Sequence, residues 1–209
     1  MMLGALNCPF GTGHMGVTAE NVAAEHDVSR AEQDAFAMTS QTRAAAAIRD
    51  GRFEDQITPV SVKVKRDKVD FICDEHPKQT DEAALAGLRP VFQKDGSVTA
   101  GNASGINDGA AALVLAQASA AQMAGLRPRA RVLGYAHAGV RPAVMGIGPI
   151  PAVQNLLQKT GLTVEDFDVI ESNEAFAAQA LAVNKALGLD AARVNPNGGA
   201  IALGHPVGA

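Results

Sequence analysis

The order of hydrophobic and polar positions in the first fifty residues is typical of helices. Ser29 and Glu32 have the spacing of a capping box, and the helix that they open is expected to end at Gly51. Apolar side chains recur within it every three or four residues, so we expect this stripe to pack in the core. The stripe consists of Ala31, Ala35, Met38, Ala45 and Ile48. A shorter helix before it is predicted to be capped by Thr18, with Glu20 in its first turn.

From residue 60 the period changes from helical to alternating. Valines occupy positions 60, 62 and 64, whereas polar side chains occupy positions 61, 63 and 65, which predicts a half-exposed strand. Basic residues gather here, a pattern that is usual for a solvated face and could also attract an anion. They are Lys63, Lys65, Arg66 and Lys68. A short helix is then expected to start at Thr80 and to end before Pro90.

The second half alternates between predicted strands and helices. Its first strand is the unbroken apolar run that ends the segment 97–116, where continuous hydrophobicity predicts burial on both faces of a sheet. The elements expected after it are a helix at 119–125, a strand at 131–136, a helix at 151–161, a strand at 168–171 and a helix at 174–187. This β-α-β-α order predicts the α/β class.

Composition narrows the class of protein further. The 209 residues are 47% hydrophobic and 19% charged with a net charge of −4, which is ordinary for a soluble globular chain of one or two domains. The mild negative charge argues against a nucleic-acid partner, and no apolar run approaches the ~18 residues that span a membrane. Cys8 and Cys73 form neither a metal-binding pattern nor a disulfide framework, so no metal site is predicted. The first ten residues lack a secretory signal, and the expected location is cytoplasmic.

A dinucleotide-binding fingerprint near the start is only superficial. Gly11, Gly13 and Gly16 spell GxGxxG, but that motif requires a strong strand before it and a βαβ unit around it. The preceding segment is broken by Gly4 and Pro9, so we reject a nicotinamide or flavin cofactor.

The most distinctive stretch is residues 195–209, NPNGGAIALGHPVGA. Its glycines permit tight backbone turns around a ligand, and Pro206 biases His205 toward an extended conformation that orients the imidazole. A histidine held in this way can accept a proton near neutral pH and serve as a general base. Residue types alone leave open a glycine-rich turn with a solvated histidine.

Two other blocks carry candidate chemistry. Asn173, in SNEAFAAQA, stands between a predicted buried strand and a helix, where α/β folds place ligands, and its amide can donate to an oxygen or orient a water. The alternative is that Asn173 only caps the helix. In TAGNASG, residues 99–105, small side chains let a long ligand lie against the backbone, and Ser104 offers a hydroxyl. A plain polar turn is the alternative there.

Together these blocks resemble the thiolase family, which comprises the acetyl-CoA acetyltransferases and the 3-ketoacyl-CoA thiolases. The histidine-bearing signature is long and specific, and HMGVTAENVA at 14–23, TAGNASG and NEAF precede it in fitting order. The resemblance implies that His205 activates a nucleophilic cysteine. It also implies that His205, with a water held by Asn173, forms an oxyanion hole for the thioester enolate.

The resemblance further implies which residues bind an acyl-CoA substrate. His14 and Met15 are expected beside the thioester, Ser104 at the pantetheine arm and Met145 in the acyl pocket. Lys78 falls near the position where relatives carry an arginine for the nucleotide end. The full set is His14, Met15, Lys78, Ala100, Ser104, Met145, Ala175 and Phe176. Coenzyme A is then a substrate, no separate cofactor is expected, and relatives that are dimers or tetramers imply a homo-oligomer.

The fold implied is thiolase-like but partial, an α/β chain with a loop domain followed by the start of the C-terminal half. We assign residues 1–97 to the substrate-binding loop domain, 98–127 to the end of the N-terminal half and 128–209 to a truncated C-terminal half. In the family, one catalytic cysteine precedes the matching region and a second follows it. Neither Cys8 nor Cys73 matches these positions, so no nucleophile is predicted in this chain, and we expect an inactive internal fragment of poor stability.

Three functions are compatible with the resemblance. The first is acetyl-CoA C-acetyltransferase activity, which cleaves 3-ketoacyl-CoA by thiolysis, or condenses two acetyl-CoA in reverse, through an acyl-cysteine. The second is a degradative 3-ketoacyl-CoA thiolase of fatty-acid β-oxidation, and the third is a non-catalytic relative that binds acyl-CoA or lipid. Met15, Phe92 and Met145 predict a crowded pocket that favours short chains, while Asn173 and His205 favour an enzyme.

Overall fold

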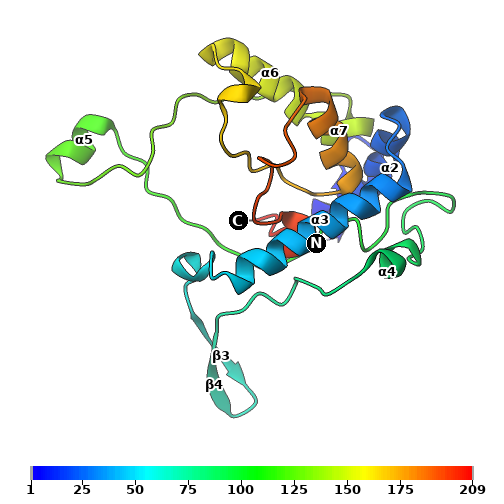
Figure 1. Cartoon of the computed structure of the whole chain (residues 1–209), viewed down its shortest axis with the longest axis horizontal. Coiled ribbons are helices and arrows are strands. Elements are labelled where there is room, and N and C mark those ends of the chain that lie inside the picture. Colours follow the sequence, from blue (N-terminus) through cyan, green and yellow to red (C-terminus); the bar gives the residue numbers. More distant parts are fainter. Residues whose placement is uncertain (1, 209) are drawn as a thin grey trace.

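The computed structural model describes residues 2–208, where helices form the body and a β-hairpin projects from it (Figure 1). The α-helices are α1 Met2–Ala5, α2 Met15–Glu25, α3 Arg30–Arg49, α4 Glu82–Ala86, α5 Ala118–Met123, α6 Pro149–Thr160, α7 Ala177–Leu187 and α8 Ala200–Leu203. The 3₁₀ helices are η1 Glu54–Gln56, η2 Pro142–Ile147 and η3 Val164–Asp166. The strands are β1 Asn7–Cys8, β2 Gly13–His14, β3 Val60–Val64 and β4 Asp67–Phe71.

Helices α2, α3 and α7 form the centre of the body, and the short α8 lies against α3 (Figure 1). One buried apolar cluster joins α2, α7 and the segments beside them; its members are Val22, Ala23, Val28, Val144, Ala178 and Ala182. A second cluster joins α3, α4, α7 and α8 through Ala37, Leu85, Ala177 and Ile201. Small alanine side chains predominate, so the helix backbones approach closely and the loops at their ends lie beside one another.

The capping box predicted for the long helix is confirmed. The Ser29 hydroxyl accepts from the Glu32 amide, while the Glu32 carboxylate accepts from the Ser29 amide at 2.7 Å. The Ser29 hydroxyl and amide both donate to the Glu32 carboxylate and lower the pKa of Glu32 below its ordinary value, because they stabilise the ionised form. Helix α3 ends at Arg49, and Gly51 follows with a φ of 69° that favours glycine.

The predicted start of α2 at Thr18 is wrong. His14 is the N-cap, and its Nδ1 accepts a hydrogen bond from the Gly16 amide at 3.0 Å, so the helix begins at Met15. The Thr18 hydroxyl donates to the Met15 carbonyl inside the helix instead. Glu20 is buried and accepts hydrogen bonds from the backbone of residues 97 and 98, which attaches α2 to the residues just before the TAGNASG segment. Histidine is not among the residues that prefer the N-cap position, so N-cap propensity did not predict that His14 would cap this helix.

The prediction that this apolar stripe forms the buried face of α3 is also wrong. Ala31, Ala35, Ala45 and Ile48 are exposed, and Met38 is half-buried. The buried face of α3 consists of Gln33, Asp34, Ala37, Ser40, Gln41, Ala44 and Ala47. Four of these seven side chains are polar, and they are buried because loops beside the helix supply hydrogen-bond partners.

The strand predicted from alternation at residues 60–64 is confirmed as β3. It pairs in antiparallel register with β4, and Lys65 turns the hairpin with a positive φ of 57°. The expectation of a half-buried face is wrong, since only Val62 is even partly covered. Figure 1 shows the reason: the hairpin projects away from the helical body.

Two other predicted strands, at 110–116 and 131–136, are not formed. Within residues 2–208 neither segment pairs with a strand, and Leu113, Val114 and Leu115 are 90%, 93% and 81% exposed. The strand expected at 168–171 is reduced to one parallel bridge between Ile170 and Val194. A strand forms only when a neighbour satisfies its backbone groups, and hydrophobicity alone does not supply that neighbour.

The remaining helices fall close to their predicted positions. Helix α5 overlaps the expected range 119–125 but begins one residue earlier, and α6 stops at Gly161 as predicted but begins at Pro149, before Pro151. Helix α4 takes Asp81 as its N-cap in place of Thr80. None of the helices described between residues 2 and 208 is both long and apolar enough to cross a membrane.

The rejected dinucleotide fingerprint has the wrong topology for that function. Strands β1 and β2 pair antiparallel across Gly11, with Asn7 opposite His14 and Cys8 opposite Gly13. A βαβ unit requires parallel strands joined through a helix, so GxGxxG here is a hairpin followed by α2.

Candidate active site

His205 and Asn173 lie side by side although 32 residues separate them in the sequence. The amide nitrogen Nδ2 of Asn173 is 3.4 Å from Nε2 of His205. An amide nitrogen only donates, so Nε2 is the acceptor in this pair, and the neutral ring then carries its proton on Nδ1. The lone pair that a general base would use therefore points toward the Asn173 amide.

Backbone contacts fix the position of His205. Gly204 has a φ of 101°, which side chains rarely adopt, and it turns the chain at the end of α8. His205 forms a parallel bridge with Ile106, and its amide donates to Oδ1 of Asn107 at 3.1 Å. A Cβ at Gly204 would meet the Asn107 side chain at 2.5 Å, so this glycine is also required by close approach.

Asn173 is not a helix cap. Helix α7 starts at Ala177 with Phe176 as its N-cap residue, and no side chain caps this end. The prediction that α7 begins at Glu174 was therefore wrong, because residues 173–176 lie before the helix, and residues 175 and 176 contact the 103–104 segment instead. Ala103 and Phe176 form an antiparallel bridge there. The Asn173 side chain is left exposed toward His205.

A cavity of about 580 Å³ opens between these segments. Eight predicted site residues line it: His14, Met15, Ser104, Met145, Asn173, Ala175, Phe176 and His205. The rest of the wall is mainly small or apolar and includes Ala5, Leu6, Val91, Phe92, Ile106 and Val207. No lysine, arginine, aspartate or glutamate of the described chain lines it.

Aromatic rings form one side of the cavity. The rings of His14 and Phe92 stack with centroids 4.8 Å apart, and Phe92 meets Phe176 edge-on at 6.1 Å. Because Nδ1 of His14 accepts from the Gly16 amide, the neutral His14 ring carries its proton on Nε2. His14 can thus donate into the cavity.

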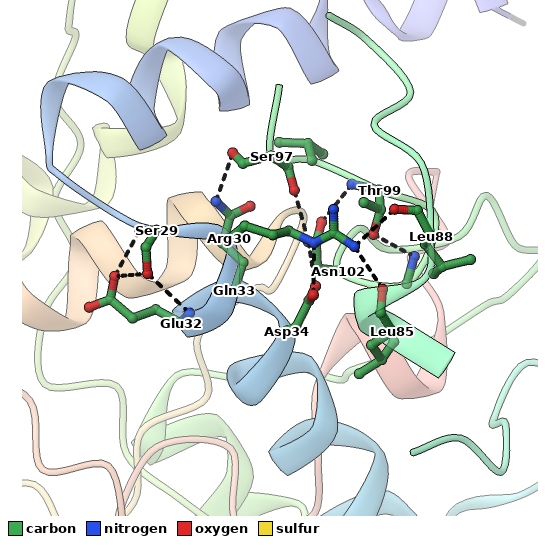
Figure 2. Close-up of polar contacts among 12 residues, drawn as sticks. Ser29, Arg30, Glu32, Gln33, Asp34, Leu85, Leu88, Ser97, Thr99 and Asn102 are labelled. Carbon is green, nitrogen blue, oxygen red and sulfur yellow. Dashed lines mark hydrogen bonds and ion pairs between the residues drawn. The ribbon is translucent and has the colours of Figure 1, made fainter. Parts of the chain in front are cut away.

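A buried polar network supports the TAGNASG segment from behind (Figure 2). Asn102 is fully buried; its Oδ1 accepts from the Thr99 amide, and its Nδ2 donates to Asp34 at 2.9 Å. Asp34 pairs in turn with Arg30 at 2.7 Å, and Arg30 also donates to the Leu85 carbonyl. This network attaches the segment to α3 and α4.

The same segment is also attached to the NEAF block. The Asn102 carbonyl accepts from the Ala177 amide at the start of α7. Ser104 donates to the Ala175 carbonyl through both its amide, at 3.0 Å, and its hydroxyl, at 2.9 Å. The Ser104 hydroxyl therefore offers an acceptor to a ligand in the cavity, since its proton is engaged.

Comparison with known proteins agrees with this geometry. The family model described as "Thiolase, N-terminal domain" matches residues 1–119, and "Thiolase, C-terminal domain" matches residues 126–209. The chain belongs to the thiolase family. It is 58% identical to the β-ketothiolase BktB of Cupriavidus necator, over 100% of this chain and 54% of that protein. It is also 58% identical to the acetyl-CoA acetyltransferase of Escherichia coli, over 98% of this chain and 52% of that protein.

Solved thiolase structures share the fold. The acetyl-CoA acetyltransferase of Bacillus anthracis superposes with a TM-score of 0.94 at 51% identity, covering 97% of this chain and 52% of that one. Human mitochondrial 3-ketoacyl-CoA thiolase in complex with CoA gives 0.90 at 47% identity, covering 96% and 50%. The α/β fold is thus a partial thiolase fold, and the chain spans about half the length of the curated relatives it matches.

Two predicted binding residues lie outside the cavity of this thiolase chain. Lys78 is exposed, and its backbone amide donates to Oε1 of Gln41 at 3.1 Å. Ala100 is exposed on the turn that precedes the cavity-lining residues. Both were placed by resemblance in loops, where position depends on loop length, and contact with the outer end of a long ligand stays a prediction.

The cysteines are also away from the cavity wall. Cys8 is buried in β1, and Cys73 is exposed after β4. Neither residue lines the cavity in which Asn173 and His205 meet.

Three residues near the site were not anticipated. Asn107 holds the His205 backbone, Glu174 is buried directly behind Asn173, and Gln179 lines the cavity from α7. Each stands within a few positions of a block that was identified, so proximity to the motifs was the available signal. What was missing was any sign of which way each side chain points.

Proposed function

We propose that this chain supplies the base and the oxyanion-binding groups of an acetyl-CoA C-acetyltransferase, which cleaves 3-ketoacyl-CoA by thiolysis or condenses two acetyl-CoA in reverse. The observation that supports it most is the 3.4 Å approach of Asn173 Nδ2 and His205 Nε2 on the wall of an uncharged cavity. Cleavage of the carbon–carbon bond in a 3-ketoacyl thioester needs a base that activates the nucleophile and a neutral donor that stabilises the enolate oxygen.

His205 would act first as a base and then as a donor. Its Nε2 takes the proton of a cysteine thiol, and the thiolate attacks C3 of the 3-ketoacyl-CoA. The C2–C3 bond breaks, which leaves an acyl-cysteine and the enolate of acetyl-CoA. The protonated Nε2 and a water on Asn173 would donate to the enolate oxygen, an arrangement worth about 2.7–4 kcal/mol per donor in other enzymes.

The acyl-cysteine and the final proton transfers need groups beyond those on this cavity wall. A second thiol would protonate the enolate carbon to give acetyl-CoA. The second group, now a thiolate, then takes the proton of the coenzyme A thiol. The coenzyme A thiolate attacks the acyl-cysteine, which forms the shortened acyl-CoA and releases the first cysteine as a thiolate that His205 reprotonates. Coenzyme A is thus a substrate, and no separate cofactor or metal takes part. We expect the active protein to be a homo-oligomer in the cytoplasm, as part of fatty-acid metabolism.

The cavity favours a short, uncharged acyl group. Met15, Phe92 and Met145 all line it, and the absence of a charged side chain on the described wall gives no partner for a carboxylate at the end of the acyl chain. A preference for acetoacetyl-CoA over longer 3-ketoacyl-CoA is expected. The reverse preference would favour the degradative thiolase of β-oxidation instead.

Thiolysis of acetoacetyl-CoA by the protein that contains this chain tests the proposal. His205→Ala and Asn173→Ala should each lower kcat by about a hundredfold or more, because each removes a group that acts in the transition state. Thr39→Ala, on the exposed side of α3, is the control and should leave kcat unchanged. Unaltered turnover in both cavity variants would contradict the proposal, and binding without turnover in the wild type would favour a non-catalytic acyl-CoA-binding relative.

A further inference from the structure

Glu174 presents a buried carboxylate that has no catalytic role in the proposed reaction. The residue is 2% exposed and stands directly after Asn173. No arginine, lysine or histidine of the described chain forms an ion pair with it. A buried carboxylate without a cation is unfavourable unless hydrogen bonds replace its hydration, so its partners indicate its role.

The Glu174 carboxylate accepts hydrogen bonds from three separate elements. The hydroxyl of Ser40, on α3, donates at 2.6 Å, and Nδ2 of Asn195 donates at 2.9 Å. The backbone amide of Ile201, in the first turn of α8, donates at 3.3 Å. One side chain of the NEAF block thus contacts α3 through Ser40 and the glycine-rich segment 195–209 at two points, Asn195 and Ile201.

A second set of contacts closes this junction. Ser40 accepts from the Gly199 amide at 3.1 Å, so the hydroxyl is used in both directions. Asn195 accepts from the Ser172 amide and donates to the Ser172 carbonyl, both at 2.7 Å. Asn195 holds a positive φ of 46°, a conformation that its surroundings must maintain. Asn173 is therefore held on both sides, through residues 172 and 174.

The same junction controls where His205 lies. Helix α8 is a single turn that ends at Leu203, and His205 follows it after one glycine. The hydrogen bond from the Ile201 amide to Glu174 therefore fixes the position and direction of α8, and with it the short segment that carries the His205 imidazole. A Cβ at Gly199 would clash with the Glu174 carboxylate carbon, so the carboxylate packs directly against this glycine.

We propose that Glu174 is a positioning residue, whose buried negative charge sets the separation of the Asn173 amide and the His205 ring. Its importance for thioester binding rests on the proposed function, whereas its structural effect does not. Charge matters as well as shape, because three donors converge on two oxygens. Glutamine would replace one of those oxygens with a donor, and at least one contact would become repulsive.

The first test uses the ligand-free protein that contains this chain and its variant Glu174→Gln. The readout is the through-space NMR contact between the Asn173 side-chain amide and the His205 ring. Glu171→Gln is the matched control, since it removes an exposed carboxylate from the same segment. We expect the contact to be lost in Glu174→Gln and kept in Glu171→Gln. A contact of wild-type strength in a folded Glu174→Gln variant would overturn the proposal.

Ser40→Ala keeps the test decisive if Glu174→Gln does not fold. It removes one donor to the carboxylate from α3 and touches neither member of the Asn173–His205 pair. The NMR contact should weaken in this variant. A contact that is unchanged in Ser40→Ala, when Glu174→Gln is unfolded, would show that the junction stabilises the fold without setting the geometry of the pair.

The second test measures the affinity of acetyl-CoA relative to CoA, because the Asn173–His205 pair faces the thioester oxygen that CoA lacks. The ratio should shift against acetyl-CoA by about fivefold to twentyfold in Glu174→Gln, the effect of losing one or two hydrogen bonds. A general loss of structure would weaken both ligands equally, and an unchanged ratio would overturn the proposal. If the wild type binds neither ligand, the proposed function fails, and the NMR contact alone decides the positioning role.

Discussion

The amide of His205 donates a hydrogen bond to Oδ1 of Asn107 at 3.1 Å, across 98 residues of sequence. Asn107 follows the TAGNASG segment, so the loop that lines one side of the cavity also holds the backbone of the proposed base. The glycine-rich segment that carries His205 is therefore not fixed by its own sequence. It is held by hydrogen bonds to two other blocks, at Asn107 and at Glu174.

Asn107→Ala should lower the thiolysis rate of the protein that contains this chain by about tenfold, because the His205 amide loses its partner and the ring loses its fixed position. Asn107→Asp retains the acceptor oxygen and should restore most of the rate. The measurement is kcat on acetoacetyl-CoA, with hydrogen exchange at the His205 amide as a second readout. Equal rates for the alanine and aspartate variants would count against this role.

Phe92→Ala should widen the acyl specificity. Phe92 contacts both His14 and Phe176, so its removal enlarges the cavity on its aromatic side and frees the His14 ring. We expect the ratio of kcat/KM for a longer 3-ketoacyl-CoA to that for acetoacetyl-CoA to rise by about tenfold, the effect of one or two methylenes in an apolar pocket. Phe10→Ala, on an exposed aromatic, is the control. A ratio that does not move would mean that Phe92 does not limit chain length.

Asn102→Ala should destabilise the chain by about 2–4 kcal/mol, because it leaves the Thr99 amide and one oxygen of buried Asp34 without partners. The measurement is the midpoint of urea unfolding compared with the wild type. Asn197→Ala is a suitable control, since its side-chain bond to Arg52 is exposed and should contribute little. A shift of similar size in both variants would show that burial of this network is unimportant.

Glu171 should make stability depend on pH. Glu171 is exposed as a whole residue, but partial desolvation of its carboxyl raises its pKa above the ordinary value, and the nearby negative charge of Glu174 adds to the effect. Because the folded-state pKa is raised, this contribution to stability is fully present below the unfolded pKa and is lost as the pH rises through the folded pKa. Glu171→Gln should therefore raise the melting temperature near neutral pH relative to the wild type. The difference should disappear in acid; a constant difference would contradict the assignment.

The 209-residue chain alone should not cleave acetoacetyl-CoA, because neither Cys8 nor Cys73 lies on the cavity wall. An active thiolase assayed in parallel provides the positive control. Turnover by the purified chain that is abolished in Cys8→Ala or Cys73→Ala would show that a cysteine of this chain reaches the cavity after all.

The parts of the fold that sequence could predict are those determined by local chemistry. The capping box at Ser29 and Glu32, the left-handed glycine that ends α6 and the alternation in β3 each act within a few residues. The prediction of a strand at 110–116 was wrong because a strand needs a pairing neighbour that is distant in the sequence. The prediction of the buried face of α3 was wrong because Gln33 and Asp34 can be buried only where neighbouring loops supply their hydrogen-bond partners.

The candidate site was predictable as a set of residues and not as a geometry. The motifs identified Asn173 and His205, and the structure brings them within 3.4 Å of each other. Their separation depends on Glu174 and Asn107, whose contacts reach across the chain to α8 and to the His205 backbone. Lys78, expected at the nucleotide end of the substrate, is exposed and does not line the cavity, so its contact with substrate stays a prediction.

The most direct test is a titration of acetyl-CoA into the isotope-labelled protein that contains this chain, followed through the NMR signals of the Asn173 side-chain amide and the His205 ring. If this pair holds the thioester oxygen, both signals should shift together and saturate at the same ligand concentration, and His205→Ala should remove the shift at Asn173. If acetyl-CoA binds while both signals stay unchanged, or does not bind at all, the pair does not form the proposed oxyanion site.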